Sequence, residues 1–172
     1  MSERRNCLVT GGSRGIGAAI ALAFAELGDR VAVHYVSQEE AAQSVVAGLP
    51  GDGHLTVRAD LEDPVAVQRM VDHVADEFGS IDVLVNNAGV FFDHAIDDVS
   101  YEEWQRAWTS TLGVNLIGAA NACWCAIRHM GPGGRIVNVG SRGAFRGEPR
   151  CPRSEEHTSE LQSRQYLVCR LL

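Results

Sequence analysis

The segment TGGSRGIG, from Thr10 to Gly17, carries the clearest chemistry in the sequence. It lies between a short apolar run and an alanine-rich stretch whose apolar residues recur at helical spacing. A turn from a strand into a helix presents unpaired backbone amides at the helix N-terminus, and glycine lets an anion approach that backbone closely. The segment therefore predicts a pyrophosphate site, with a purely steric glycine turn as the alternative.

The next apolar run, RVAVHYV at residues 30–36, bears on which dinucleotide would bind. Sites for NAD usually place a carboxylate at the end of this strand to hold the ribose hydroxyls, whereas a 2′-phosphate needs a cation nearby. Here the position falls on His34 or Tyr35, and Arg14 stands in the glycine turn, where its guanidinium fork suits a phosphate. We expect NADP(H) to be preferred and NAD(H) to be possible; the alternative for Arg14 is a solvated turn residue.

These motifs need a scaffold, and the hydrophobic pattern predicts one. Ser37, with Glu40 three positions on, is expected to cap the second helix. Apolar strands that alternate with amphipathic helices predict an α/β fold, a doubly wound parallel sheet of the Rossmann type. The expected strands are residues 6–12, 30–36, 54–61, 81–89 and 134–141, and the expected helices are 15–28, 37–49, 63–79 and 100–130.

The composition excludes several classes of function. A chain of 172 residues is long enough for one domain, and a net charge of -7 leaves no basic stripe for nucleic acid. The five cysteines lack the paired spacing of a zinc site, and the N-terminus has no apolar stretch of signal-peptide length. We expect a cytoplasmic protein with reduced thiols and no metal site, nucleic-acid partner or membrane span.

Four segments taken together, TGGSRGIG, RADL, LVNNAG and GRIVNVGS, resemble the classical short-chain dehydrogenase/reductases, above all the 3-oxoacyl-carrier-protein reductase type. The resemblance runs from about residue 5 to about residue 152. It implies a nicotinamide cofactor, a small carbonyl or alcohol substrate and a homo-oligomeric parent. The cofactor-binding residues that it implies, with the Tyr35 position considered above, are Gly11, Ser13, Arg14, Gly15, Ile16, Gly17, Tyr35, Asp60, Leu61, Asn87, Ala88 and Gly89.

Catalysis in the resembled family is hydride exchange assisted by Asn, Ser, Tyr and Lys. The resemblance assigns Asn115 in VNLIG to the asparagine that holds a water of the proton relay, and Ser141 in VNVGS to the serine that bonds the substrate oxygen. Trp104 stands farther ahead of Asn115 than the family's aromatic residue does, so we expect an extra helical turn near Thr109.

The Tyr-x-x-x-Lys motif that should follow Ser141 is absent from the sequence. Ser154 and Thr158 stand where it is expected, Tyr166 is the only later tyrosine, and the chain contains no lysine. Residues 153–163, RSEEHTSELQS, resemble the translation of a common sequencing-library adapter, and LVCRLL at 167–172 fits the adapter's continuation. We expect an incomplete dinucleotide-binding domain at 1–152, without its C-terminal strands and helices, and an artefactual tail at 153–172; an amphipathic helix is the alternative for the tail.

Two functional hypotheses follow. The parent protein is expected to be an NADPH-dependent carbonyl reductase, or else an enzyme that oxidises an alcohol of the sugar or steroid type. The chain as written is expected to be inactive, a cofactor-binding fragment that does not assemble normally. Its fifth strand should be an exposed sheet edge, which is a liability for aggregation.

Overall fold

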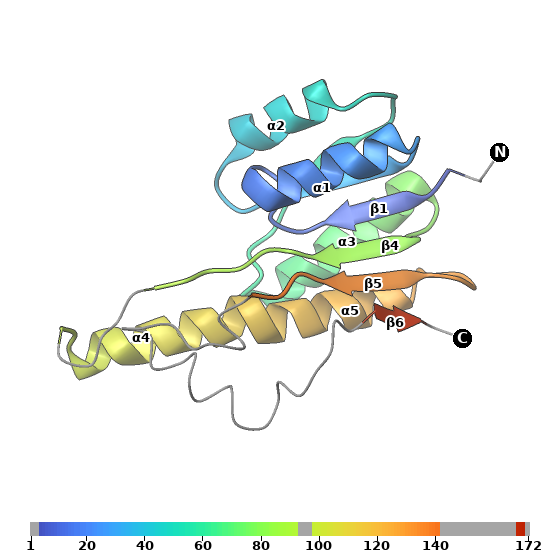
Figure 1. Cartoon of the computed structure of the whole chain (residues 1–172). Helices are drawn as coiled ribbons and strands as arrows, with labels where there is room; N and C mark the ends of the chain where they lie inside the picture. Colours follow the sequence, from blue (N-terminus) through green and yellow to red (C-terminus); the bar gives the residue numbers. More distant parts are fainter. Residues whose placement is uncertain (1–3, 93–97, 142–167, 171–172) are drawn as a thin grey trace.

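The computed structural model of the chain describes residues 4–92, 98–141 and 168–170 (Figure 1). Within these ranges the strands form one sheet in the order β3-β2-β1-β4-β5-β6. The strands are β1 (Asn6–Val9), β2 (Arg30–Tyr35), β3 (Leu55–Arg58), β4 (Val83–Asn86), β5 (Arg135–Asn138) and β6 (Val168–Arg170). Strands β1 to β5 pair in parallel, which confirms the predicted doubly wound fold, and β6 pairs with β5 in antiparallel orientation.

Helices cover both faces of the sheet (Figure 1). Helices α1 and α2 pack on one face, and α3 and α5 pack on the other. Their bounds are α1 (Gly15–Glu26), α2 (Glu39–Gly48), α3 (Pro64–Phe78), α4 (Tyr101–Leu112), the π-helical segment η1 (Gly113–Gly118) and α5 (Ala119–Ile127).

The central strand β1 shows why the strands are apolar without alternation. Leu8 belongs to the core cluster on the α3 and α5 side, whereas Cys7 and Val9 belong to the cluster on the α1 and α2 side. All three side chains are fully buried. Because both faces of a parallel sheet are covered by helices, both sets of side chains must be apolar.

Helix starts follow local capping chemistry, with one correction. Asp63 caps α3 through its carboxylate, which accepts a hydrogen bond from the Val65 amide. The predicted cap at Ser37 is wrong: α2 begins after Gln38, which makes no side-chain cap hydrogen bond. The reciprocal capping box lies instead at Ser100 and Glu103, ahead of α4.

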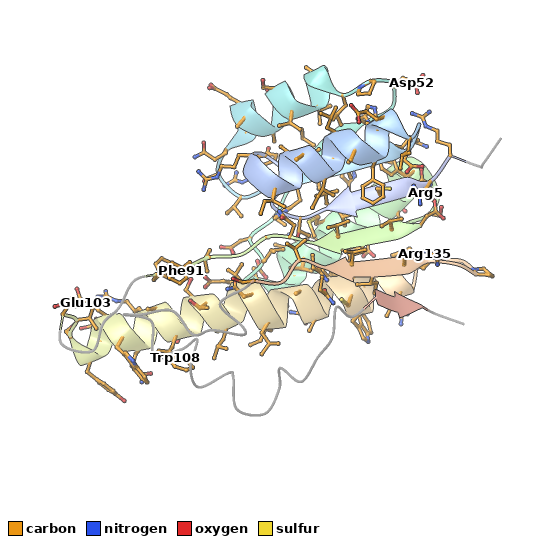
Figure 2. All side chains as sticks on the ribbon, in the orientation of Figure 1. Arg5, Asp52, Phe91, Glu103, Trp108 and Arg135 are labelled. Atoms are coloured by element: carbon orange, nitrogen blue, oxygen red, sulfur yellow. The ribbon has the colours of Figure 1, made fainter. Side chains whose placement is uncertain are left out.

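The helical run 101–127 is continuous but not uniform. Helix α4 stays α-helical to Leu112, and the wider π-helical turn follows at η1. The extra turn expected near Thr109 stays a prediction. By length and composition alone the run could cross a membrane. Its C-terminal part, α5, packs against α3, whereas α4 projects past the sheet, where Glu103 and Trp108 lie (Figure 2).

The predicted free edge at β5 is also corrected. Val137 pairs with Val168 and Ile136 pairs with Cys169, so β6 covers this edge. These β6 residues come from the tail that we expected to be artefactual. Residues 142–167, which include the positions of the missing tyrosine and lysine motif, lie outside the described residues.

Candidate functional site

A cleft of about 580 Å³ lies where the carboxyl ends of β1, β2, β3 and β4 meet. All of the cofactor-binding residues expected from the sequence line it: Gly11, Ser13, Arg14, Gly15, Ile16, Gly17, Tyr35, Asp60, Leu61, Asn87, Ala88 and Gly89. Further lining comes from His34, Val36, Ser37, Gln38, Glu62, Val90 and Val114. Clefts at this end of an open parallel sheet are where such folds bind ligands.

The glycine turn brings backbone close to backbone. Gly11 has a φ of 62°, and a Cβ there would lie 2.9 Å from the Ala88 Cα. At Gly17 a Cβ would lie 2.3 Å from the Gly11 carbonyl oxygen and 2.5 Å from the Asn87 Nδ2. Only glycine lets α1 start this close to the turn and lets the turn lie against the segment after β4.

The N-terminus of α1 has backbone amides that could bind an anion. Its N-cap residue is Arg14, whose side chain makes no cap hydrogen bond, and the first turn carries no acidic residue. A Cβ added at Gly15 would meet no atom within 4 Å, so the approach is open. The exposed Arg14 guanidinium bonds to no residue that the structure describes. Free amides and the helix dipole therefore converge on one point, which fits a pyrophosphate, and the Arg14 cation lies beside that point.

Thr10 joins β1 to the segment after β4, and sequence reasoning did not single it out. Its fully buried hydroxyl lies 3.2 Å from the Val85 carbonyl oxygen and accepts from the amides of Asn87 and Ala88, at 3.0 Å each. The Asn87 side chain donates back to the carbonyls of Thr10 at 2.9 Å and Gly11 at 3.1 Å. Asn87 therefore fixes the floor of the cleft, since its amide nitrogen is committed to the backbone.

A carboxylate from the next helix acts on the last residue of β2, and sequence reasoning missed it. Burial raises the pKa of the Tyr35 hydroxyl, and the charge of Glu39, in the first turn of α2, raises that pKa further. Arg58, at the end of β3, lowers it and donates from Nε to the Val36 carbonyl at 3.1 Å. A carboxylate and an arginine thus flank the strand end at which NAD and NADP sites differ.

The loop after β3 lies against the helical run. The Asp60 carboxylate accepts from the Glu62 amide at 3.0 Å, which closes a local turn. The Ser110 hydroxyl donates to the Glu62 carboxylate at 2.5 Å. Leu61 is almost fully buried beneath this turn, so its backbone rather than its side chain is placed for a ligand.

The two residues assigned to catalysis do not line the cleft. The Asn115 side chain, in η1, accepts from the Val90 amide at 2.8 Å and donates to the Val90 carbonyl at 2.9 Å. Both polar atoms of this side chain thus hold the segment after β4. Ser141 is exposed and follows the carboxyl end of β5.

Comparisons with known proteins agree with this geometry. The family model described as short chain dehydrogenase matches residues 5–152. An uncharacterized oxidoreductase of Methylorubrum extorquens is 39% identical over 141 residues, covering 81% of this chain and 55% of that protein. A 3-oxoacyl-[acyl-carrier-protein] reductase of Staphylococcus aureus is 37% identical over 153 residues, covering 87% and 61%.

A solved structure is also similar. A short chain dehydrogenase from Burkholderia cenocepacia, in complex with NADP, superposes with a TM-score of 0.77 and 42% sequence identity. The match covers 89% of this chain and 63% of that one. The chain thus spans between about half and two thirds of the length of the proteins that it resembles.

Proposed function

Because the chain belongs to the short-chain dehydrogenase family, we propose that it binds NADP(H) in the cleft at the carboxyl ends of β1 to β4, and that the whole protein reduces a small carbonyl substrate. The observation that carries the proposal is the uncapped N-terminus of α1, with Arg14 beside it and the glycine turn around it. The NADP held by the similar Burkholderia structure supports the choice of cofactor.

Each part of the cleft receives a role in the proposal. The pyrophosphate is held by the backbone amides between the Gly11 turn and the first turn of α1. The 2′-phosphate lies near Arg14, whose guanidinium is otherwise unpaired among the described residues. The adenine end contacts Asp60 and Leu61, and the segment from Asn87 to Gly89 leads toward the nicotinamide ribose.

The chemistry divides between the cofactor and the chain. The cofactor supplies a hydride to the substrate carbonyl. Asn115 holds Val90 and so fixes the segment that borders the cleft, and Ser141 donates a hydrogen bond to the substrate oxygen. The chain has no lysine to lower the pKa of a tyrosine proton donor. We therefore propose that this chain binds cofactor without turning over substrate.

The proposed cofactor unit is residues 1–152, and residues 153–172 are proposed to be foreign to it. The family match also ends at residue 152. The whole protein is proposed to be a cytoplasmic homo-oligomer that acts on a small carbonyl or alcohol and binds neither nucleic acid nor membrane. The net charge of -7 supports the exclusion of nucleic acid.

The test is a titration of the full chain with NADPH and with NADH, followed by the fluorescence of the reduced nicotinamide. Arg14→Ala should weaken NADPH binding about tenfold, the equivalent of about 1.4 kcal/mol, and leave NADH binding unchanged. Arg69→Ala is the matched control, because Arg69 is exposed on α3 and does not line the cleft. Equal losses for both nucleotides would contradict the role of Arg14, and absence of any binding would contradict the proposed function.

Two further measurements test the cofactor preference and the proposed lack of turnover. Tyr35→Asp should move the preference toward NADH, because a carboxylate there repels a 2′-phosphate and accepts from ribose hydroxyls. The full chain should show no oxidation of NADPH with acetoacetyl thioesters or simple ketones. Clear turnover at a reproducible specific rate would overturn the proposed inactivity.

A further inference from the structure

His34 lies at the meeting point of three segments beneath the cleft. Its side chain is fully buried at the end of β2. The Gly11 amide donates to its Nδ1 at 3.0 Å, and its Nε2 lies 3.0 Å from the Ala59 carbonyl oxygen. The imidazole therefore links the glycine turn after β1 to the end of β3.

These two partners fix the state of the ring. A carbonyl oxygen only accepts, so Nε2 must carry the hydrogen, and an amide N–H only donates, so Nδ1 must offer its lone pair. The neutral tautomer with hydrogen on Nε2 meets both conditions. Burial lowers the pKa of His34 and outweighs the opposing effects of the Ala59 carbonyl and the Asp60 charge, which favours this neutral ring.

The glycine turn depends on this contact because the other hydrogen bonds of the turn do not include the Gly11 amide. Asn87 bonds the carbonyls of Thr10 and Gly11, and the Gly12 amide donates to the His34 backbone carbonyl at 2.8 Å. The Gly11 amide donates to the His34 ring, at a φ of 62° that few residues other than glycine adopt. Without an acceptor there, a partly buried amide would lose its hydrogen bond.

We propose that His34 is a positioning residue that holds the Gly11 turn in the conformation that receives the cofactor pyrophosphate. The inference rests on the proposed function, since it concerns the same cleft. His34 acts through Gly11, and its committed ring nitrogens keep the turn in place before any nucleotide arrives. Its effect should therefore be seen in nucleotide affinity and in the protection of the Gly11 amide.

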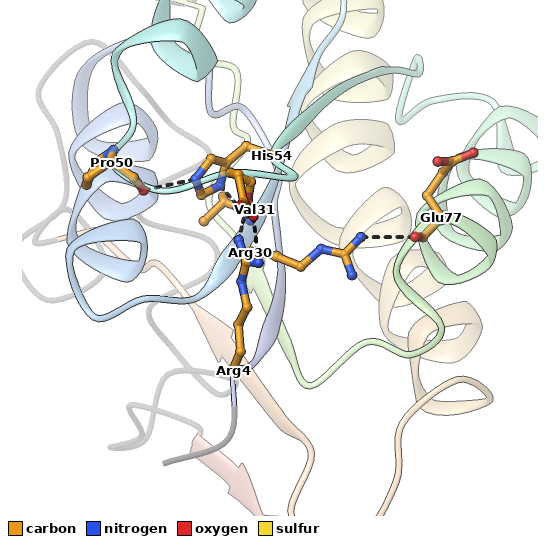
Figure 3. Close-up of polar contacts among 7 residues, drawn as sticks. Arg4, Arg30, Val31, Pro50, His54 and Glu77 are labelled. Carbon is orange, nitrogen blue, oxygen red and sulfur yellow. Dashed lines mark hydrogen bonds and ion pairs between the residues drawn. The ribbon is translucent and has the colours of Figure 1, made fainter. Parts of the chain in front are cut away.

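The chain offers a matched control at the opposite end of the same strand. His54 accepts at Nδ1 from the Val31 amide at 3.1 Å, and its Nε2 lies 3.0 Å from the Pro50 carbonyl (Figure 3). This is the same pairing of one amide and one carbonyl. It lies near the amino end of β2, beside Arg30, and His54 does not line the cleft.

The experiment uses substitutions that keep one half of the contact. The oxygen of Asn falls near the position of Nδ1, so His34→Asn retains an acceptor for Gly11. The nitrogen of Gln falls near Nε2, so His34→Gln retains the donor toward Ala59. His34→Leu retains neither, and His54→Leu is the control. NADPH affinity, thermal unfolding and hydrogen exchange of the Gly11 amide by NMR are measured on each full-length variant.

We expect the Kd for NADPH to rise about tenfold in His34→Leu and His34→Gln and to stay within about threefold of the wild type in His34→Asn. The Gly11 amide should exchange faster in the first two variants alone. His54→Leu should lower the unfolding temperature without changing the Kd. Similar affinities for the Asn and Gln variants, or affinity losses that follow unfolding temperature across both histidines, would overturn the proposal.

The two proposals fail separately. If the wild-type chain bound neither NADPH nor NADH, the proposed function would fail. Hydrogen exchange of the Gly11 amide would still test the positioning role of His34. Fast exchange restricted to His34→Leu and His34→Gln supports that role, and equal protection in all variants refutes it.

Discussion

Replacing Gly17 by alanine tests whether the turn and α1 are packed as tightly as the structure shows. The new methyl group would lie 2.3 Å from the Gly11 carbonyl oxygen and 2.5 Å from the Asn87 Nδ2. Neither neighbour can easily move, because that Nδ2 itself donates to the carbonyls of Thr10 and Gly11. The substitution should therefore displace either the helix or the turn.

The magnitude follows from two opposing effects. Alanine is the better helix former by about 1 kcal/mol, which stabilises the folded state. Overpacking a tight contact costs about 1–3 kcal/mol, and the rigid neighbours place Gly17 at the upper end. The net loss should be about 2 kcal/mol in the free energy of unfolding, equivalent to a fall of about 4–8 °C in unfolding temperature for a chain of this size.

Thermal unfolding followed by far-UV circular dichroism measures this loss, and titration with NADPH measures the effect on the cleft. Gly48→Ala is the control: Gly48 also lies in a helix, α2, and a Cβ there meets no atom within 4 Å. That variant should gain up to about 1 kcal/mol. If Gly17→Ala unfolded at the wild-type temperature and kept full affinity for NADPH, the tight packing of the turn would be refuted.

Three further predictions concern charge and protonation. Burial lowers the pKa of His34 from 6.5, so below that pH the unfolded chain binds a proton that the folded chain does not. The free energy of unfolding should therefore fall as the pH drops below 6.5. His34→Asn should remove that part of the pH dependence, which thermal scans at several pH values measure. Asp29 is 3% exposed and bonds the Arg5 backbone and guanidinium, so Asp29→Asn should lose about 1–2 kcal/mol in urea unfolding. The control for this variant is Glu102→Gln, which removes the exposed ion pair with Arg106 and should change nothing measurable. Burial raises the pKa of Cys7 to about 12, so Cys7 should resist thiol reagents until the chain unfolds.

The order of elements was predictable because each one has a local signal. Buried parallel strands must be apolar on both faces, as Leu8 and Val9 are, and helices show their own period. Capping was less predictable. Ser37 and Ser100 are each followed three residues later by glutamate, yet the Ser100 box alone forms. Ser37 lies one residue ahead of the N-cap Gln38 and lines the cleft instead.

The candidate site was predictable where sequence position determines spatial position. Residues at the carboxyl ends of parallel strands meet at one edge, so Gly11, Asp60 and Asn87 come together. Contacts through space were not predictable. The tautomer of His34 depends on Ala59, and the charge beside Tyr35 comes from Glu39 in the next helix. Pairing of β5 with β6 likewise depends on residues far away in the chain.

The two glycines that bound the π-helical segment η1 both lie against the loop after β3. A Cβ at Gly113 would lie 3.1 Å from the Glu62 side chain, and one at Gly118 would lie 2.6 Å from the Leu61 carbonyl oxygen, so both glycines face the loop after β3. Residues five apart point in different directions in an α-helix but share a face when the turn widens to the i→i+5 spacing.

The sequence GVNLIG therefore indicates why the helix widens around Asn115. Gly113 and Gly118, five residues apart, let the helix widen where it meets Glu62 and Leu61 in the loop after β3. The wider turn is where Asn115 bonds both backbone groups of Val90. We conclude that η1 adapts the helix to the cleft, because the close contacts of both glycines and the Asn115 bonds fall within it.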